Sequence, residues 1–318
     1  MAHLMRTCWV LDHPAHVRLL APFIRSGSTS DLLICTQRFE VEKMIETGDG
    51  YLPRRETLWV PRPIGDKRRR KALMRLRMVK KRLKRGNFDR IISIGAPLEL
   101  RAAKRVIPRR WYISDTEANH LAHRLAKNAA TDIVIPTHWR KDIQALDFSG
   151  TIHHLDGIHG HIHLRPGLIP REVSDPPKIL VRRLKGDGIH DVDEVIDIPD
   201  SFFDGLEITI ADENEVSCHP WKLCEEISAH DGVITQSVTL ASESALLGTP
   251  TLLVSKAQRG FLDRLSKDGY PLFRCEGEQE TYLEFLAGLH LRDALELPEW
   301  PDARNKLAKM FEMELLEL

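Results

Sequence analysis

The sequence predicts an α/β protein with two domains, each built on a parallel β-sheet covered by helices. Short apolar runs alternate with longer helical patterns in both halves of the chain, and strands separated by helices form parallel sheets through right-handed crossovers. A chain of 318 residues is long for one hydrophobic core and sufficient for two. Residues 166–177 contain four prolines and read as a linker, because proline continues neither regular element.

The strands follow in order from the apolar runs. We expect them at 7–11, 31–36, 90–94, 111–114 and 132–135 in the first half, and at 178–181, 206–211, 232–235 and 251–254 in the second. The predicted domains are therefore 1–165 and 178–299, with the linker at 166–177. Apolar residues at helical spacing predict a C-terminal helix within 300–318 that packs back on the first domain. Ligands of parallel sheets bind beyond the carboxyl ends of the strands.

Composition narrows the class of protein. Lys plus Arg and Asp plus Glu both number 46, so the formal net charge is zero, and overall charge gives no reason to expect a nucleic-acid partner. The five cysteines are odd in number and widely spaced, which suits a reducing compartment. No apolar run is long enough for a signal peptide or a bilayer span. We expect a cytoplasmic protein that associates at most peripherally with a membrane.

The densest charge lies in residues 67–85, which hold twelve Lys or Arg and no acidic residue. Leu73, Leu76, Val79 and Leu83 recur at helical spacing, so one side of the predicted helix should pack on the sheet. The other side would offer positive charge to anionic lipid headgroups or to a phosphorylated acceptor. The alternative is a solvated face without a ligand. Nucleic acid is not expected, because the segment lacks aromatic residues for base stacking. The residues assigned to this membrane or anion surface are Arg75, Lys80, Lys81 and Lys84.

The most informative segment for function is 234–255. It reads as a buried strand, a hydroxyl-rich turn, a helix that contains Glu243, a Gly-Thr-Pro stop and a second buried strand. The free N–H groups and the dipole at such a helix start suit a diphosphate. We therefore assign Gln236, Ser237 and Thr239 to phosphate contacts and Glu243 to two ribose hydroxyls. The alternative is an ordinary strand–turn–helix unit, in which Gly248 is merely a C-cap.

Six short motifs, in order along the chain, carry a family resemblance. They are Trp-Val-Leu-Asp-His-Pro-Ala-His-Val at 9–17, Ile-Ser-Ile-Gly at 92–95, Ser-Asp-Thr-Glu-Ala-Asn-His at 114–120, Leu-Asp-Gly at 155–157, Lys-Ile-Leu-Val-Arg-Arg at 178–183 and Ala-Leu-Leu-Gly-Thr-Pro at 245–250. The chain resembles the mostly archaeal family of predicted glycosyltransferases called domain of unknown function 354, relatives of the sugar-nucleotide 2-epimerases. The resemblance implies the glycosyltransferase B architecture, two Rossmann-like domains facing each other across a cleft. It also implies a nucleotide-diphosphate sugar as the donor substrate, an unknown acceptor and no cofactor.

The chain departs from that family in two ways. Gln-Ser-Val-Thr stands at 236–239, where the family usually has a glycine-rich turn, so the backbone is less open to a diphosphate. The chain also lacks the Gly-Asp-Thr and His-Arg-x-Glu-Asn motifs that similar epimerases carry. We therefore expect sugar transfer rather than epimerisation. A non-enzymatic protein that binds an anionic ligand or partner on the same fold is the other alternative.

Two clusters in the first half are candidates for catalysis. His13 and His16 follow the first strand, and an imidazole there could take a proton from an acceptor hydroxyl. The alternative is that a histidine caps the next helix. Asp115 and Glu117 follow the expected strand at 111–114, where a carboxylate could act as a base. An aspartate that merely caps a helix is equally compatible with this pattern.

The remaining assignments concern the walls of the cleft and the donor phosphates. Arg182 and Arg183 end the strand that opens the second domain, and only one of two adjacent strand residues can face a ligand. We assign Arg182 to the phosphates. The residues assigned to the cleft are Gly95, His120, Gly157 and His159. The histidine-rich run 153–163 suggests a metal, but one strand seldom encloses an ion, so we expect a polar strand and no metal. We also expect a metal-independent reaction, because no Asp-x-Asp triplet is positioned after a strand to hold a divalent ion against the diphosphate.

Overall fold

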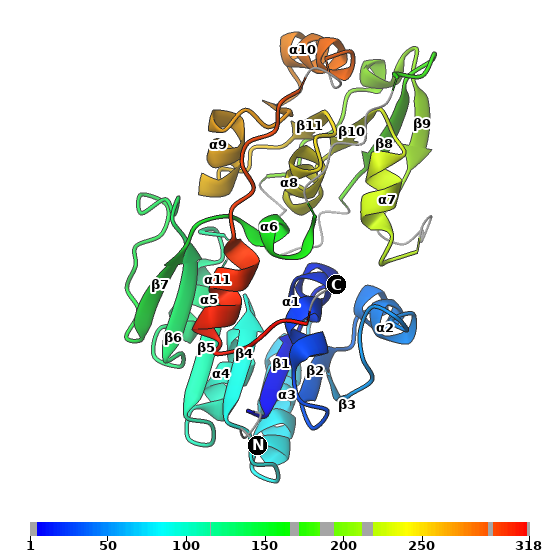
Figure 1. Ribbon diagram of the computed structural model, residues 1–318. Coiled ribbons are helices and arrows are strands. Elements are labelled where there is room, and N and C mark those ends of the chain that lie inside the picture. Colours follow the sequence, from blue (N-terminus) through cyan, green and yellow to red (C-terminus); the bar gives the residue numbers. More distant parts are fainter. Residues whose placement is uncertain are drawn as a thin grey trace. The chain divides into compact units, whose positions relative to one another are not determined.

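The computed structural model describes residues 5–114, 116–165, 172–184, 194–211, 219–291 and 295–316. The chain divides into two compact units (Figure 1). The first comprises Met1–His163 together with Asp302–Leu318, and the second comprises Leu164–Pro301. Residues 166–171 of the predicted linker lie outside the described residues. Within the part of the chain that the structure describes, no helix is both long and apolar enough to cross a bilayer.

The first unit is built on a seven-stranded parallel sheet in the order β3-β2-β1-β4-β5-β6-β7. The strands are β1 (Thr7–Leu11), β2 (Leu32–Thr36), β3 (Glu56–Val60), β4 (Arg90–Ile94), β5 (Arg109–Ile113), β6 (Asp132–Pro136) and β7 (Thr151–Leu155). β1 lies in the centre, where Trp9 is in register with Leu33 on one side and Ile92 on the other. Its residues are buried on both faces, as expected of a parallel strand covered by helices.

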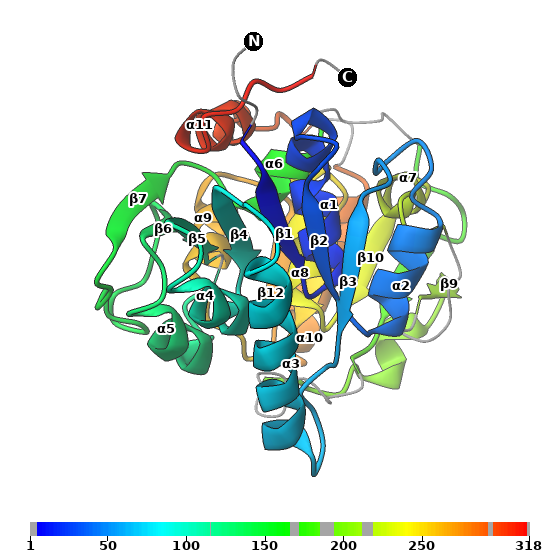
Figure 2. The same ribbon diagram turned by 90° about the horizontal axis from the view of Figure 1, so that it is seen from below.

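Helices cover both faces of this sheet (Figure 2). They are α1 (Pro14–Ser26), α2 (Phe39–Glu46), α3 (Arg68–Leu83), α4 (Pro97–Ala103), α5 (His120–Ala126), α6 (His159–His163) and α11 (Ala303–Met310). α3, α4 and α5 pack side by side on one face, whereas α6 packs against both α1 and α11 on the other. The apolar side chains between the helices and the sheet form the core of the unit.

The C-terminal helix packs on the first unit, as the sequence predicts. Directly after α11, the fully buried ring of Phe311 makes edge-on contacts with Phe23 and Trp111, with ring centroids 5.4 and 5.2 Å away. The Arg90 guanidinium donates a hydrogen bond to the Phe311 carbonyl. Residues more than 200 positions apart in the sequence therefore share one core.

The second unit has a five-stranded parallel sheet in the order β12-β11-β10-β8-β9. The strands are β8 (Lys178–Arg182), β9 (Glu207–Ile210), β10 (Gly232–Thr235), β11 (Thr251–Val254) and β12 (Leu272–Cys275). The helices are η1 (Asp200–Phe203, a 3₁₀ turn), α7 (Leu223–Ser228), α8 (Val238–Leu246), α9 (Gly260–Lys267) and α10 (Gln279–Leu289). The unit has its own core, in which the rings of Phe202 and Tyr282 stack at 4.3 Å. The predicted fold class is confirmed.

Candidate functional site

Four polar side chains meet at the carboxyl edge of the first sheet. Asp12 directly follows β1 and accepts hydrogen bonds from the Thr36 hydroxyl, at the end of β2, and from Arg75 Nη2 of α3 at 2.8 Å. The Arg75 Nε donates to Glu99 in α4. One guanidinium therefore joins two carboxylates from different elements, and the network fixes the turn that leads into α1.

The assignment of Arg75 to an exposed anion surface is wrong. Arg75 is 2% exposed and lies with Val79 and Leu83 on the inner side of α3. The phase of the helix explains this, because positions four residues apart share a face. The outer side instead exposes Leu73, which the apolar spacing predicts to be buried and which is 47% exposed.

The network sets the charge of its carboxyl groups. Desolvation opposes ionisation of Asp12, but the Arg75 guanidinium and the Thr36 hydroxyl outweigh it and hold the pKa of Asp12 well below its usual range. Burial raises the pKa of Glu99, and the attraction of Arg75 offsets this effect in part. Asp12 is therefore ionised at neutral pH and, as a weak proton acceptor, is better suited to holding the turn than to general-base catalysis.

The structure brings His13 and His16 together at the start of α1, with ring centroids 5.7 Å apart. His13 is the N-cap, and its Nδ1 accepts the Ala15 N–H at 3.3 Å. Desolvation, followed by the positive charge of Arg38, lowers the pKa of His13 well below its usual value. The neutral ring that accepts through Nδ1 carries its proton on Nε2, so it is a donor there. Of the two histidines, His16 is the better candidate for a base.

Glu117 is buried, and its Oε1 accepts the backbone N–H of Arg140 at 2.8 Å. The carboxylate thus links the segments that follow β5 and β6. The cap of α5 is Asn119, whose side chain accepts the Ala122 N–H at 3.3 Å. The predicted catalytic residue Asp115 lies outside the described residues. A catalytic role for Glu117 stays a prediction.

His120 is exposed at the start of α5, and its Nδ1 donates to the Gln144 side-chain oxygen at 2.6 Å. Ser114 and His123, which the sequence analysis did not single out, are buried and form a hydrogen bond at 2.8 Å between Oγ and Nε2. This contact joins the end of β5 to the middle of α5. A serine directly after a buried strand was the signal available in the sequence.

The two glycines that the sequence assigns to the cleft, Gly95 and Gly157, lie at turns that need a left-handed backbone. Gly95 has φ +56° and Gly157 has φ +117°, values that disfavour a side chain.

The expectation of a polar strand over 153–163 is wrong beyond Leu155, because His159 begins the helix α6 and is buried. His163 Nδ1 donates to the His159 carbonyl one turn earlier, at 3.0 Å. Within the described residues, no group of three or more His, Cys, Asp or Glu side chains is arranged to hold a metal ion.

In the second unit, Gln236 directly follows β10 and holds two neighbouring segments by hydrogen bonds. Its side-chain oxygen accepts the Leu184 N–H at 2.7 Å, and its amide nitrogen donates to the Ile196 carbonyl at 2.6 Å. Gln236 is 4% exposed. It therefore supports the turn before α8, while its direct contact with a phosphate stays a prediction.

The turn before α8 has the features of an anion site. Ser237 caps the helix by accepting the Leu240 N–H at 3.4 Å. The N–H groups of Val238 and Thr239, the first two helical positions, have no carbonyl within the helix to bond to. These two N–H groups, the Thr239 hydroxyl and the positive end of the helix dipole offer donors to an anion.

Glu243 lies further along the same helix and is fully buried. A ribose could reach its carboxylate only if the groups that cover Glu243 moved. The assignment of Glu243 to ribose hydroxyls stays a prediction that requires such a movement. Thr239 is only partly buried and is therefore more accessible to a ligand than Glu243.

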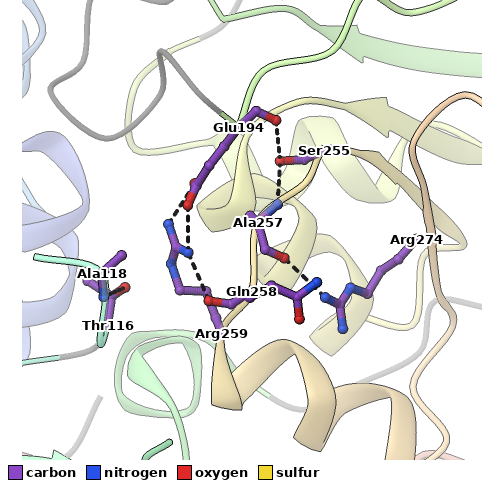
Figure 3. A network of polar contacts seen from close by, with 8 residues as sticks. All are labelled: Thr116, Ala118, Glu194, Ser255, Ala257, Gln258, Arg259 and Arg274. Carbon is purple, nitrogen blue, oxygen red and sulfur yellow. Dashed lines mark hydrogen bonds and ion pairs between the residues drawn. The ribbon is translucent and has the colours of Figure 1, made fainter. Parts of the chain in front are cut away.

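The ion pair between Glu194 and Arg259, which we call the clamp, lies at the carboxyl edge of the five-stranded sheet (Figure 3). The sequence does not predict it. The Glu194 carboxylate accepts two hydrogen bonds from Arg259, at 2.9 and 2.7 Å, and its carbonyl accepts the Ser255 hydroxyl at 3.0 Å. Val195 forms an antiparallel bridge with Ser255, and Ile196 is held by Gln236. Residues 194–196 therefore cross the ends of β10 and β11.

Arg182, the last residue of β8, and Arg183, which follows it, differ in their environments. Arg183 is exposed, and its guanidinium lies 5.7 Å from the centre of the Phe203 ring. Arg182 is partly buried, and its carbonyl accepts bonds from Gln236 and Thr235. Arg182 remains the candidate for phosphate binding.

Comparison with known proteins identifies the fold. No protein-family model matches the chain, and no curated protein sequence matches it. Among solved structures, it is similar to a candidate UDP-N-acetylglucosamine 2-epimerase from Listeria monocytogenes, with a TM-score of 0.70, 10% identity and 99% of each chain covered. It is also similar to the Methanocaldococcus jannaschii UDP-GlcNAc 2-epimerase in complex with UDP-GlcNAc and UDP (TM-score 0.64, 11% identity, 97% of this chain and 99% of that chain covered). A third is MurG from Acinetobacter baumannii, with a TM-score of 0.54, 10% identity and coverage of 96% of this chain and 99% of that chain.

These likenesses establish the class of architecture. The two parallel-sheet, Rossmann-like units have the glycosyltransferase B fold, as the sequence predicts. At about one identical residue in ten, the similarity describes the fold, and fold by itself does not determine the reaction.

Proposed function

We propose that this chain binds a nucleoside diphosphate sugar at the start of α8 and transfers the sugar to an acceptor. The observation that carries the proposal is the capped turn from Gln236 to Thr239, where helix N–H groups and hydroxyls lie at the carboxyl end of β10. Donors in this arrangement suit a diphosphate. In support, structures of similar fold were solved with UDP-GlcNAc and with UDP.

In the proposed reaction, the acceptor hydroxyl attacks the anomeric carbon of the sugar. The new carbon–oxygen bond forms as the bond to the diphosphate breaks, the nucleoside diphosphate leaves with the bonding electrons, and His16 takes the hydroxyl proton. Arg182 and the α8 N-terminus would stabilise the negative charge that grows on the leaving group. No metal and no cofactor are required, because these groups supply the positive charge.

Epimerisation is the second candidate, because several epimerase structures share the fold over nearly the full chain. That reaction needs a base that removes a proton from carbon. The carboxylates described at the carboxyl edge of the first sheet bond to protein groups, Asp12 and Glu99 to Arg75 and Glu117 to the Arg140 N–H. Such engaged carboxylates are poorly placed for this task, so we favour transfer. A protein that binds the same anion without chemistry is the third candidate.

Replacement of His16 by glutamine is expected to lower the rate of sugar transfer by about 10²–10⁴-fold, the usual contribution of a general base. The measurement is mass spectrometry of products from a panel of UDP-, GDP- and dTDP-sugars with a lipid-linked and a soluble acceptor mixture. His154→Gln is the matched control, because His154 is exposed on the edge strand β7.

Each outcome of this assay has a meaning. Release of nucleoside diphosphate with a glycosylated product supports transfer, whereas a changed sugar without an acceptor identifies an epimerase. If His16→Gln is as fast as the unaltered chain, the role of His16 is wrong. Donor binding without any product would identify the non-enzymatic alternative.

A further inference from the structure

The outer side of α3 concentrates positive charge on one surface of the first unit. We call this surface the basic face, and it consists of Arg70, Leu73, Met74, Arg77, Lys80, Lys81 and Lys84. All seven side chains belong to exposed residues, and Leu73 and Met74 are each 47% exposed. The inner side, with Arg75, Val79 and Leu83, is buried. The helix is therefore anchored in the fold, and its outer side is free of the core.

The cations of the basic face are not neutralised by the rest of the described chain. Of the basic residues on α3, Arg75 pairs with Asp12 and Glu99, and Arg82 pairs with Glu56. Within the described residues, the five cations of the basic face form no ion pair with an acidic side chain, and residues 67–85 contain no acid. Like charges this close repel one another, at a cost that an anionic partner would remove.

The shape and chemistry of the face select the partner. A helix of 16 residues extends over about 24 Å, so its cations meet several headgroups of a flat surface at once. Leu73 and Met74 lie among the cations and could insert between the headgroups, while the long Lys stems lie along the interface. Nucleic acid would favour aromatic residues for stacking, which are absent from 67–85. We propose that the basic face docks this protein on bilayers that contain anionic phospholipid.

This inference does not depend on the proposed reaction, because the basic face contains none of the residues assigned to the donor site. It adds a location for the reaction: docking would bring the first unit to a bilayer surface, where an acceptor attached to lipid would be concentrated.

The test is co-sedimentation of the full chain with vesicles of equimolar phosphatidylglycerol and phosphatidylcholine, compared with vesicles of phosphatidylcholine alone. We expect binding to the anionic vesicles that weakens as salt is raised. The variant Arg77→Gln, Lys80→Gln, Lys81→Gln, Lys84→Gln should lower the partition coefficient by about a hundredfold or more, since each cation near an anionic surface contributes several-fold.

The matched control removes the same charge elsewhere. Lys141→Gln, Lys267→Gln, Lys306→Gln, Lys309→Gln replaces four exposed lysines outside α3 and should retain most of the binding. A second variant, Leu73→Gln with Met74→Gln, keeps every charge and should weaken binding by about tenfold while the salt dependence stays the same, because it removes the buried apolar contact. Circular dichroism checks that each variant is folded.

Three results would overturn the proposal. They are equal binding to the anionic and the neutral vesicles, equal losses in the two four-residue variants, and no vesicle binding at all by the unaltered chain. A parallel titration with labelled RNA covers the competing partner. Binding of RNA that depends on the basic face, without binding of vesicles, would assign the surface to nucleic acid.

Discussion

Replacement of Arg75 by alanine is expected to destabilise the first unit by about 3–5 kcal/mol, the usual cost of removing one partner of a buried ion pair. The guanidinium joins Asp12 and Glu99, and the Arg75 and Glu99 side chains are 3% and 0% exposed. Without it, Glu99 must either keep an uncompensated buried charge or take up a proton. The measurement is urea denaturation followed by far-ultraviolet circular dichroism.

Two further variants separate this cause from a general effect on α3. Lys81→Ala lies on the exposed side of the same helix and should change the free energy of unfolding by less than about 0.5 kcal/mol. Arg75→Met combined with Glu99→Gln should recover part of the loss, since no buried carboxylate then lacks its partner. An Arg75→Ala variant as stable as Lys81→Ala would refute the structural role of the network.

Replacement of Phe311 by alanine is expected to cost about 3–5 kcal/mol, because it removes a fully buried ring and leaves a cavity. The ring contacts Phe23 and Trp111, so it fastens the segment after α11 to the core of the first unit. Calorimetric unfolding measures the loss. We also expect faster hydrogen exchange in α11, which would be held by fewer contacts.

Leu316→Ala provides the comparison for Phe311. Leu316 is 67% exposed, and its backbone N–H donates to the Ser26 hydroxyl at 2.9 Å, a bond that the substitution leaves intact. The variant should unfold within about 0.5 kcal/mol of the unaltered chain. Similar losses for the two substitutions would mean that the C-terminal segment contributes little through the Phe311 ring.

The central strands are predictable from the sequence, whereas the edge strands are harder to recognise. β1, β4, β10 and β11 lie at the predicted bounds, because central parallel strands are buried on both faces and appear as apolar runs. Two edge strands are not among those expected from the sequence: β3 (Glu56–Val60), which is of mixed exposure, and β12 (Leu272–Cys275), which contains Arg274. Edge strands have one neighbour and tolerate polar residues, so their sequence signal is weak.

The candidate site divides in a similar way. The location of His13 and His16 at a strand end follows from local sequence, since only Asp12 and His13 separate the end of β1 from Pro14, which begins α1. The inward orientation of Arg75 does not follow from local sequence, because basic residues occur on all sides of the predicted helix and their pattern does not show which of them faces the core. The Glu194–Arg259 clamp joins residues 65 positions apart, and a single sequence contains no local signal for such a contact.

The measurement that tests the central claim most directly is isothermal titration of the full chain with UDP, GDP and dTDP. We expect one of them to bind, and we expect Thr239→Glu to abolish that binding, because a carboxylate in the first turn of α8 repels the diphosphate. Thr239→Gln, of the same size and without the charge, should retain most of the affinity. If none of the three nucleotides binds, or if Thr239→Glu binds as tightly as the unaltered chain, the result would contradict a diphosphate site at the start of α8.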